Sequence, residues 1–156
     1  RRAEGFKLRM LVETPEGSLR EVTEADTVHS EVSVLNLQGE LFFAAAEELQ
    51  AELTRLLDTS ARFIVLRVQE AYNLDATTAA AIGHVAARAR RRGGRLLLCG
   101  VRPGMKATFE RAGFLHQLGE DAIFLADREL LGSTRRALAY ARELARADWP
   151  PEGLHI

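Results

Sequence analysis

The spacing of hydrophobic and polar residues changes along the chain, and the changes mark the expected strands. Residues 18–25 (SLREVTEA) and 31–39 (EVSVLNLQG) alternate apolar with polar side chains, which predicts an antiparallel pair of strands. Residues 61–68 (ARFIVLRV) and 95–101 (RLLLCGV) are almost continuously apolar, as expected of strands covered on both faces. Residues 122–126 (AIFLA) predict a last short strand.

Four other segments have the period of an amphipathic helix. From Leu41 to Leu57 apolar residues recur at intervals of three and four, and a second helix is expected from Asp75 to Gly93. Residues 102–113 predict a short helix that ends at Gly113, and a last helix is expected with Ser133 as its N-cap. Since helices alternate with strands, the sequence predicts an α/β fold with one mixed sheet of about five strands and about four helices packed on it.

The ends of the chain differ from its middle. Residues 1–17 close with the turn sequence Thr14-Pro15-Glu16-Gly17 and are predicted to be a linker. Residues 18–147 are expected to form one domain, and residues 148–156 (DWPPEGLHI) a flexible tail. The chain begins with Arg1 instead of methionine, so we expect an additional N-terminal part before it.

Charge narrows the choice of partner. The formal net charge is −1, so the chain as a whole does not attract nucleic acid, and no nucleic-acid partner is expected. The most basic stretch, residues 88–95 (RARRRGGR), has no aromatic residue for base stacking. Its arginines either stabilise the carboxyl end of a helix or meet an anionic membrane surface or partner, and the sequence leaves both interpretations open.

Patterns for catalysis and metal binding are missing from the sequence. The four histidines lie far apart, and the single cysteine, Cys99, belongs to an apolar run typical of a core. Residues 100–106 (GVRPGMK) have glycines but no Walker spacing and no serine or threonine after the lysine. We therefore expect no catalytic residue, no metal, no cofactor and no enzymatic activity.

One motif, residues 72–82 (YNLDATTAAAI), lies between the first buried strand and the second expected helix. Asp75 is suited to cap that helix by accepting a hydrogen bond from the amide of Thr77 or Thr78. The two hydroxyls would lie in the first turn, where a phosphate is locally tolerated and would add nearly two negative charges to the surface. A simple helix cap and a phosphorylation switch both fit these residues.

The order and spacing of three segments resemble the STAS domain, which occurs in bacterial anti-sigma factor antagonists and at the cytoplasmic C-terminus of SulP-type anion transporters. The segments are residues 32–49, 63–101 and 110–124. Within the family, residues 39–49 (GELFFAAAEEL) and 118–124 (LGEDAIF) are most similar to the transporter branch. The resemblance implies the STAS fold with an N-terminal antiparallel pair.

The transporter branch implies a non-catalytic regulatory and assembly domain at the cytoplasmic face of the cell membrane. The expected partners are the membrane transport domain of the same polypeptide, a second copy in a dimeric transporter, and a regulatory protein. The transported anion would belong to the sulfate, bicarbonate or dicarboxylate class and would be selected by the membrane part.

The antagonist branch implies a different use of the same loop. Its Asp-Ser-Ser-Gly motif, phosphorylated on the second serine, corresponds in position to Asp75, Ala76, Thr77 and Thr78, and Asn73 lies in the same loop. Thr77 would be the phospho-acceptor of an antagonist-like signalling module, although Ala76 and Thr78 depart from the motif. Nucleotide or lipid sensing at this loop is a third interpretation, but the sequence has no phosphate-binding signature for it.

Overall fold

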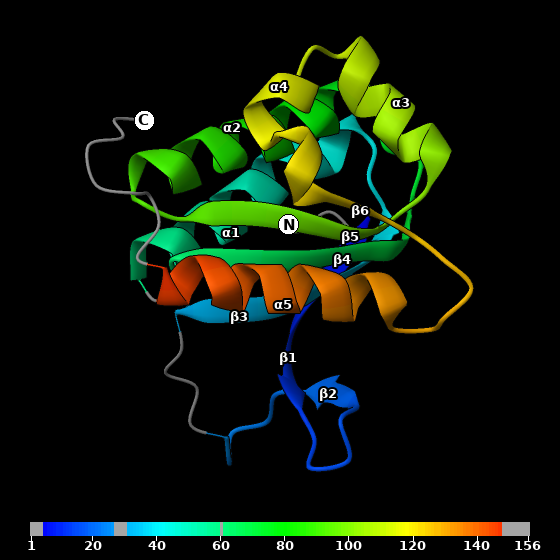
Figure 1. The fold of residues 1–156 in the computed structure, drawn as a ribbon. Helices are drawn as coiled ribbons and strands as arrows, with labels where there is room; N and C mark the ends of the chain where they lie inside the picture. Colours follow the sequence, from blue (N-terminus) through cyan, green and yellow to red (C-terminus); the bar gives the residue numbers. More distant parts are fainter. Residues whose placement is uncertain (1–4, 27–30, 60, 148–156) are drawn as a thin grey trace.

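The computed structural model describes residues 5–26, 31–59 and 61–147, which form a twisted sheet with helices on both faces (Figure 1). The strands lie in the order β2-β1-β3-β4-β5-β6. Strands β3 to β6 are parallel to one another, whereas β1 is antiparallel to both of its neighbours. The strands are β1 (Phe6–Glu13), β2 (Leu19–Glu21), β3 (Val32–Glu40), β4 (Phe63–Tyr72), β5 (Arg95–Val101) and β6 (Ile123–Leu125).

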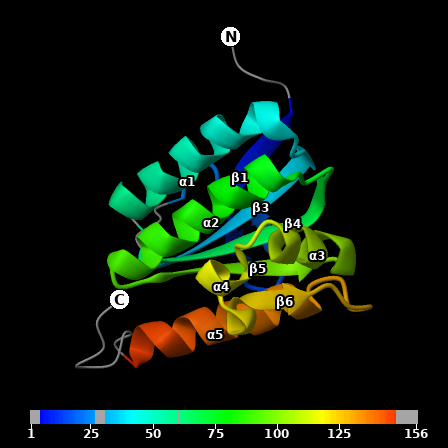
Figure 2. The ribbon, with the colours of Figure 1, turned by 90° about the horizontal axis from the view of Figure 1, so that it is seen from above.

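The helices divide into two layers. Helices α1 (Ala46–Thr59), α2 (Ala76–Arg91), α3 (Pro103–Arg111) and α4 (Leu115–Leu118) pack on one face of the sheet, where α1 and α2 lie side by side (Figure 2). Helix α5 (Gly132–Arg146) packs on the other face. Two short 3₁₀ turns, η1 (Phe43–Ala45) and η2 (Glu120–Ala122), precede α1 and β6. None of the helices in the described ranges is long and apolar enough to cross a bilayer.

The α/β fold and its mixed sheet are confirmed, with six strands in place of about five. All seven residues of β5 are buried, and so are the first six of β4, which agrees with their nearly continuous apolar sequence. These two strands are central and carry a helix layer on each face, so almost every side chain is removed from water.

The linker predicted for residues 1–17 is wrong for residues 6–13. These residues form β1, which pairs with β3 over the register from Phe6–Gly39 to Leu11–Val34, and Phe6 is only 5% exposed. Charged Lys7 and Arg9 alternate with apolar residues in β1, and this alternation is sufficient for a strand that has a helix layer over only part of its length.

The predicted pairing of residues 18–25 with 31–39 is also wrong. Both segments contain strands, β2 and β3, but β1 lies between them and pairs with each. The turn at Thr14 to Gly17 closes the β1–β2 hairpin, with a hydrogen bond of 2.8 Å from the Thr14 amide to the Ser18 carbonyl and a left-handed φ of 82° at Gly17. The predicted turn is present, but it joins strands β1 and β2 and does not end a linker.

Helix ends follow local signals at most positions. Asp75 caps α2 and Gly113 follows α3 with a φ of 79°, both as predicted. The predicted N-cap at Ser133 is wrong, because α5 begins at Gly132 with Leu131 as its N-cap. The Ser133 hydroxyl instead accepts a buried hydrogen bond of 2.9 Å from the Gly100 amide of β5. The tail expected over residues 148–156 lies outside the described residues.

Candidate functional site

The loop between β4 and α2 lies at the edge of the sheet where the parallel strands end. Asn73, the first residue after β4, has a left-handed φ of 57°, which asparagine tolerates better than most other residues. Its Nδ2 donates a 2.7 Å hydrogen bond to Oε2 of Glu40 at the end of β3. The loop is therefore held to the neighbouring strand by a side-chain contact.

Two of the motif residues have structural roles. Asp75 Oδ1 accepts a 2.9 Å hydrogen bond from the amide of Thr78, which is the capping contact expected at a helix N-terminus. The side chain of Thr78 is fully buried, and its hydroxyl donates to the carbonyl of Phe42 at 3.2 Å. Thr78 therefore joins the start of α2 to the segment before α1, and its hydroxyl is not accessible to a modifying enzyme.

The other two motif residues face solvent. Ala76 and Thr77 are exposed in the first turn of α2, and no hydrogen bond of the Thr77 hydroxyl is found within the part of the chain that the structure describes. The Asp75 carboxylate caps this turn, and the turn itself contains no further acidic side chain, so a negative group on Thr77 would meet the positive end of the helix with one carboxylate nearby. Of the adjacent hydroxyls, only that of Thr77 is placed as a switch requires.

Two large apolar side chains are exposed near this loop. Phe43 is 67% exposed and Tyr72 is 52% exposed, although Leu41 and Ala71, close to them in the chain, are buried. The rings of Phe43 and Phe42 meet edge to face, with their centroids 5.7 Å apart. The Tyr72 carbonyl accepts a 2.8 Å hydrogen bond from the Leu41 amide. We call Phe43, Tyr72, Asn73 and Thr77 the loop surface. Sequence reasoning missed both aromatic residues, because an aromatic residue near a strand end usually belongs to the core.

A cleft of about 370 Å³ lies beside this loop. It is lined by Asn73, Leu74, Arg102, Gly104, Met105 and Thr108. The guanidinium of Arg102 donates to the carbonyls of Gln69 and Ala71, so it fastens the end of β5 to β4. The segment that resembled a phosphate loop is the start of α3, with Pro103 in its first turn.

The basic run at the end of α2 is largely engaged in contacts within the chain. Arg88 forms a two-pronged ion pair with Asp58 at 2.8 and 3.1 Å, and Arg92 approaches the same carboxylate at 3.6 Å. Arg95 is 3% exposed and lies 2.6 Å from Asp121, and this guanidinium lowers the pKa of Asp121 to about 2. These contacts favour the structural interpretation of the run.

Cys99 lies in the core under α5, as its apolar sequence context predicts. It is completely buried, and burial raises the pKa of its thiol to about 11. In the described residues no three histidine, cysteine, aspartate or glutamate side chains are grouped as metal ligands.

Comparison with known proteins gives consistent relatives. A family model described as "STAS domain" matches residues 24–128. YvdB of Bacillus subtilis (strain 168), which is named as a sulfate transporter, is 22% identical over 127 residues, covering 73% of this chain and 24% of YvdB. BtrV of Bordetella bronchiseptica, which is named as an anti-sigma factor antagonist, is 34% identical over 79 residues, 51% of this chain and 68% of BtrV.

A solved structure extends the match to 80% of this chain. The crystal structure of a sulfate transporter family protein from Wolinella succinogenes superposes with a TM-score of 0.61 at 27% identity, covering 80% of this chain and 96% of that one. The chain thus corresponds to about a quarter of the length of YvdB and to nearly all of the Wolinella structure.

Proposed function

The chain belongs to the STAS domain family, and we propose that it is the regulatory and assembly domain of a SulP-type secondary anion transporter. The observation that carries the proposal is the Wolinella match, which covers 96% of a sulfate transporter family chain at 27% identity. The match to one quarter of YvdB further supports a domain attached to a longer transport protein. The domain would lie at the cytoplasmic face of the membrane.

In this proposal the domain is not catalytic and acts through protein contacts. Its contact site is the loop surface, which includes two aromatic side chains that are more than half exposed. Aromatic residues are enriched at protein interfaces, since they bury a large area at a small cost in conformational entropy. The occupant is the membrane transport domain of the same polypeptide, with a second copy of the transporter or a regulatory protein as further partners.

In this proposal the domain does not select the transported anion. We propose a carrier of the sulfate, bicarbonate or dicarboxylate class in which the membrane part selects the anion. The domain then changes the transport rate or the assembly of the carrier, and it leaves the order of preference among anions unchanged.

The test uses the complete transporter polypeptide that carries this chain, reconstituted in vesicles. The double variant F43S/Y72S should lower sulfate uptake or transporter assembly several-fold, because it removes the aromatic contacts. Leu130→Ser is the matched control, since Leu130 is 78% exposed and lies in the β6–α5 connection. Equal uptake and assembly in the double variant, the control and the unchanged protein would contradict the proposal.

A specific observation favours one second candidate. Thr77, which the resemblance assigns to the position of the antagonist phospho-acceptor, is exposed while Thr78 is buried, and BtrV matches at 34% identity over 51% of this chain. An antagonist-like module would gain one phosphate when mixed with ATP and a serine kinase of the anti-sigma factor type. The mass shift should disappear in Thr77→Ala and persist in Thr108→Ala, and an unmodified chain would exclude this function for the kinase tested.

A further inference from the structure

Two arginine side chains from different elements converge where the end of α2, the start of β5 and the end of α4 meet. The Nη2 atoms of Arg90 and Arg95 both donate to the carbonyl oxygen of Leu118, at 3.3 and 2.9 Å. Both nitrogens also lie 2.7 Å from the point where a Cβ on Gly119 would stand. Two guanidinium groups therefore share one neutral acceptor. We call Arg90, Arg95, Leu118 and Gly119 the arginine corner.

The arginine corner depends on the glycine at position 119. Gly119 has a left-handed φ of 86°, which glycine adopts without strain. Oδ1 of Asp121 lies 2.9 Å from the same Cβ point, so a side chain at residue 119 would meet both guanidinium groups and this carboxylate. The absence of a side chain therefore lets charged groups from α2, β5 and the turn after α4 gather at one place.

Only one of the two positive charges has a counter-ion. Arg95 is buried, and its Nη1 donates to Asp121 Oδ2 at 2.6 Å. The Tyr140 hydroxyl donates to the same oxygen at 2.6 Å, so the carboxylate is already engaged twice. Arg90 is partly buried, and among the described residues its guanidinium donates only to the Leu118 carbonyl and has no carboxylate within ion-pair distance. The corner therefore has one positive charge without a partner.

The electrostatic environment of Arg90 reflects this shortage of negative charge. Burial and then the positive charge of Arg95 lower the pKa of Arg90, and Asp121 opposes this effect only in part. The partly negative carboxyl end of α2 offsets some of the repulsion. The exposed residues Arg91 and Glu120, which flank the corner in the chain, have opposite charges. A bound anion beside Arg90 would replace a repulsion with an attraction.

We propose that the arginine corner binds a tetrahedral oxyanion, such as sulfate or a phosphate group, through the guanidinium of Arg90 and the positive charge of Arg95. A guanidinium donates two parallel hydrogen bonds to two oxygens of such an anion, and this pairing is not available to a halide ion. The Nε and Nη1 atoms of Arg90 are the donors left for the ligand. The inference is independent of the proposed transporter role, since it uses only contacts within this chain.

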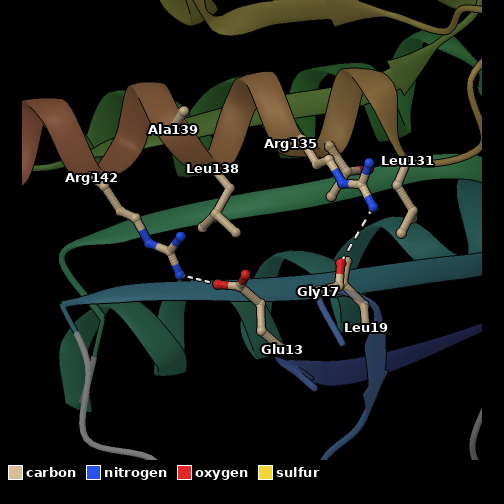
Figure 3. Close-up of a pocket in the computed structure, with 9 residues that line it drawn as sticks. Glu13, Gly17, Leu19, Leu131, Arg135, Leu138, Ala139 and Arg142 are labelled. Atoms are coloured by element: carbon tan, nitrogen blue, oxygen red, sulfur yellow. Dashed lines mark hydrogen bonds and ion pairs between the residues drawn. The ribbon is translucent and has the colours of Figure 1, made fainter. Parts of the chain in front are cut away.

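Other exposed arginines lack this arrangement and provide a control. On α5, Arg142 contacts the carboxylate of Glu13, and Arg135 donates to the Gly17 carbonyl at 3.3 Å (Figure 3). The Arg135 contact thus has the same length as that of Arg90 to its carbonyl. Among the described residues, however, no second arginine donates to the Gly17 carbonyl. Arg135 is therefore the matched control for Arg90.

The test follows the Gly119 amide in heteronuclear NMR spectra of the full chain, because this amide lies within the corner. Sodium sulfate should shift its signal along a saturating curve with a Kd of roughly 1–10 mM, as expected of a few charge-assisted hydrogen bonds at an accessible site. Sodium chloride at equal ionic strength should give a small shift that does not saturate, since both salts screen charges alike.

Substitutions of Arg90 separate binding from a role in the fold. Arg90→Gln should abolish the saturating shift, Arg90→Lys should weaken binding several-fold because lysine lacks the fork, and Arg135→Gln should leave the titration unchanged. Without sulfate, Arg90→Gln should melt at or above the temperature of the unchanged chain, because it removes the repulsion. Added sulfate should then raise the melting temperature of the unchanged chain more than that of the variant.

Three results would overturn the proposal. Equal shifts of the Gly119 amide in sulfate and chloride would show an effect of ionic strength only. A sulfate titration that is the same in Arg90→Gln and in the unchanged chain would exclude Arg90 as a ligand. A lower melting temperature of Arg90→Gln without sulfate, with no difference in the gain from sulfate, would assign Arg90 to the fold alone.

A free anion and a lipid headgroup offer the same oxyanion, and a second experiment separates these sources. The full chain is sedimented with phosphatidylcholine vesicles that contain phosphatidic acid. Sedimentation that is lost in Arg90→Gln and retained in Arg135→Gln would identify the headgroup as the source. A chain that binds sulfate and stays in the supernatant would identify the free anion.

Discussion

The Nε atom of Arg67 donates a 3.0 Å hydrogen bond to the hydroxyl of Thr134, which joins the middle of the sheet to the first turn of α5. Arg67 is 8% exposed, and its Nη1 also donates to Asn36 Oδ1 at 2.9 Å. The Thr134 hydroxyl in turn lies 3.4 Å from the sulfur of Cys99. Three strands and one helix thus meet in a single buried polar network.

Thr134→Val should lower the free energy of unfolding by about 1–3 kcal/mol, because it leaves a buried guanidinium donor without its partner. Thr77→Val is the matched control and should change stability by less than about 0.5 kcal/mol, since Thr77 is exposed. Urea denaturation followed by circular dichroism measures both. Equal stability of the two variants would show that the Arg67–Thr134 contact contributes nothing.

Asp75→Ala should destabilise the chain by about 1 kcal/mol through loss of the cap on α2. Asp75→Asn keeps an oxygen that can accept from the Thr78 amide, so its loss should be much smaller. The hydrogen bond is lost only in the alanine variant, whereas the charge is lost in both variants. The comparison therefore separates the two contributions. If asparagine were as costly as alanine, the charge of Asp75 would be the stabilising property.

The ion pair of Asp121 and Arg95 should make stability depend on pH in the acid range. The pKa of Asp121 is about 2 in the folded chain, below its usual value near 4, so the carboxylate stabilises the fold above about pH 4. This contribution is lost as the pH falls from about 4 toward 2. The stability difference between the unchanged chain and Asp121→Asn should therefore narrow over that range in urea titrations. If the stability difference between the two proteins stays constant from pH 4 to pH 2, the ion pair of Asp121 and Arg95 is not the source of the pH dependence.

Cys99 should react slowly with a thiol reagent at about pH 8, where an ordinary thiol is partly ionised. Burial and a pKa near 11 both keep the sulfur unreactive in the folded chain. In concentrated guanidinium chloride the reaction should become rapid. Equal rates in the two conditions would mean that the sheet under α5 opens readily.

Much of the fold could be predicted from the sequence because β4, β5 and α2 have strong local signals. The apolar runs required a strand covered on both faces, and Asp75 marked the start of α2 at its correct residue. Strand β1 was missed because its pairing with β3 connects segments far apart in the chain, and its charged residues resemble those of a linker. Local patterns do not report such distant pairings.

The candidate site was only partly predictable for the same reason. Thr77 and Thr78 are adjacent and chemically identical, yet one is exposed and the other is fully buried against Phe42. That difference arises from the position of the segment before α1, which no local pattern contains. The exposure of Phe43 and Tyr72 likewise depends on which apolar side chains find a neighbour in the folded chain.

Thr77→Glu tests whether the exposed hydroxyl is a switch. The substitution places a negative charge at the positive end of α2, so stability should change by less than about 0.5 kcal/mol. Coupling to the partner should change more, because the charge enters the loop surface beside Phe43 and Tyr72. The measurements are the melting temperature of the chain and the uptake rate of the complete transporter, with Thr77→Gln as the uncharged control. A large fall in melting temperature with unchanged uptake would refute the switch, since it would assign Thr77 to the fold alone.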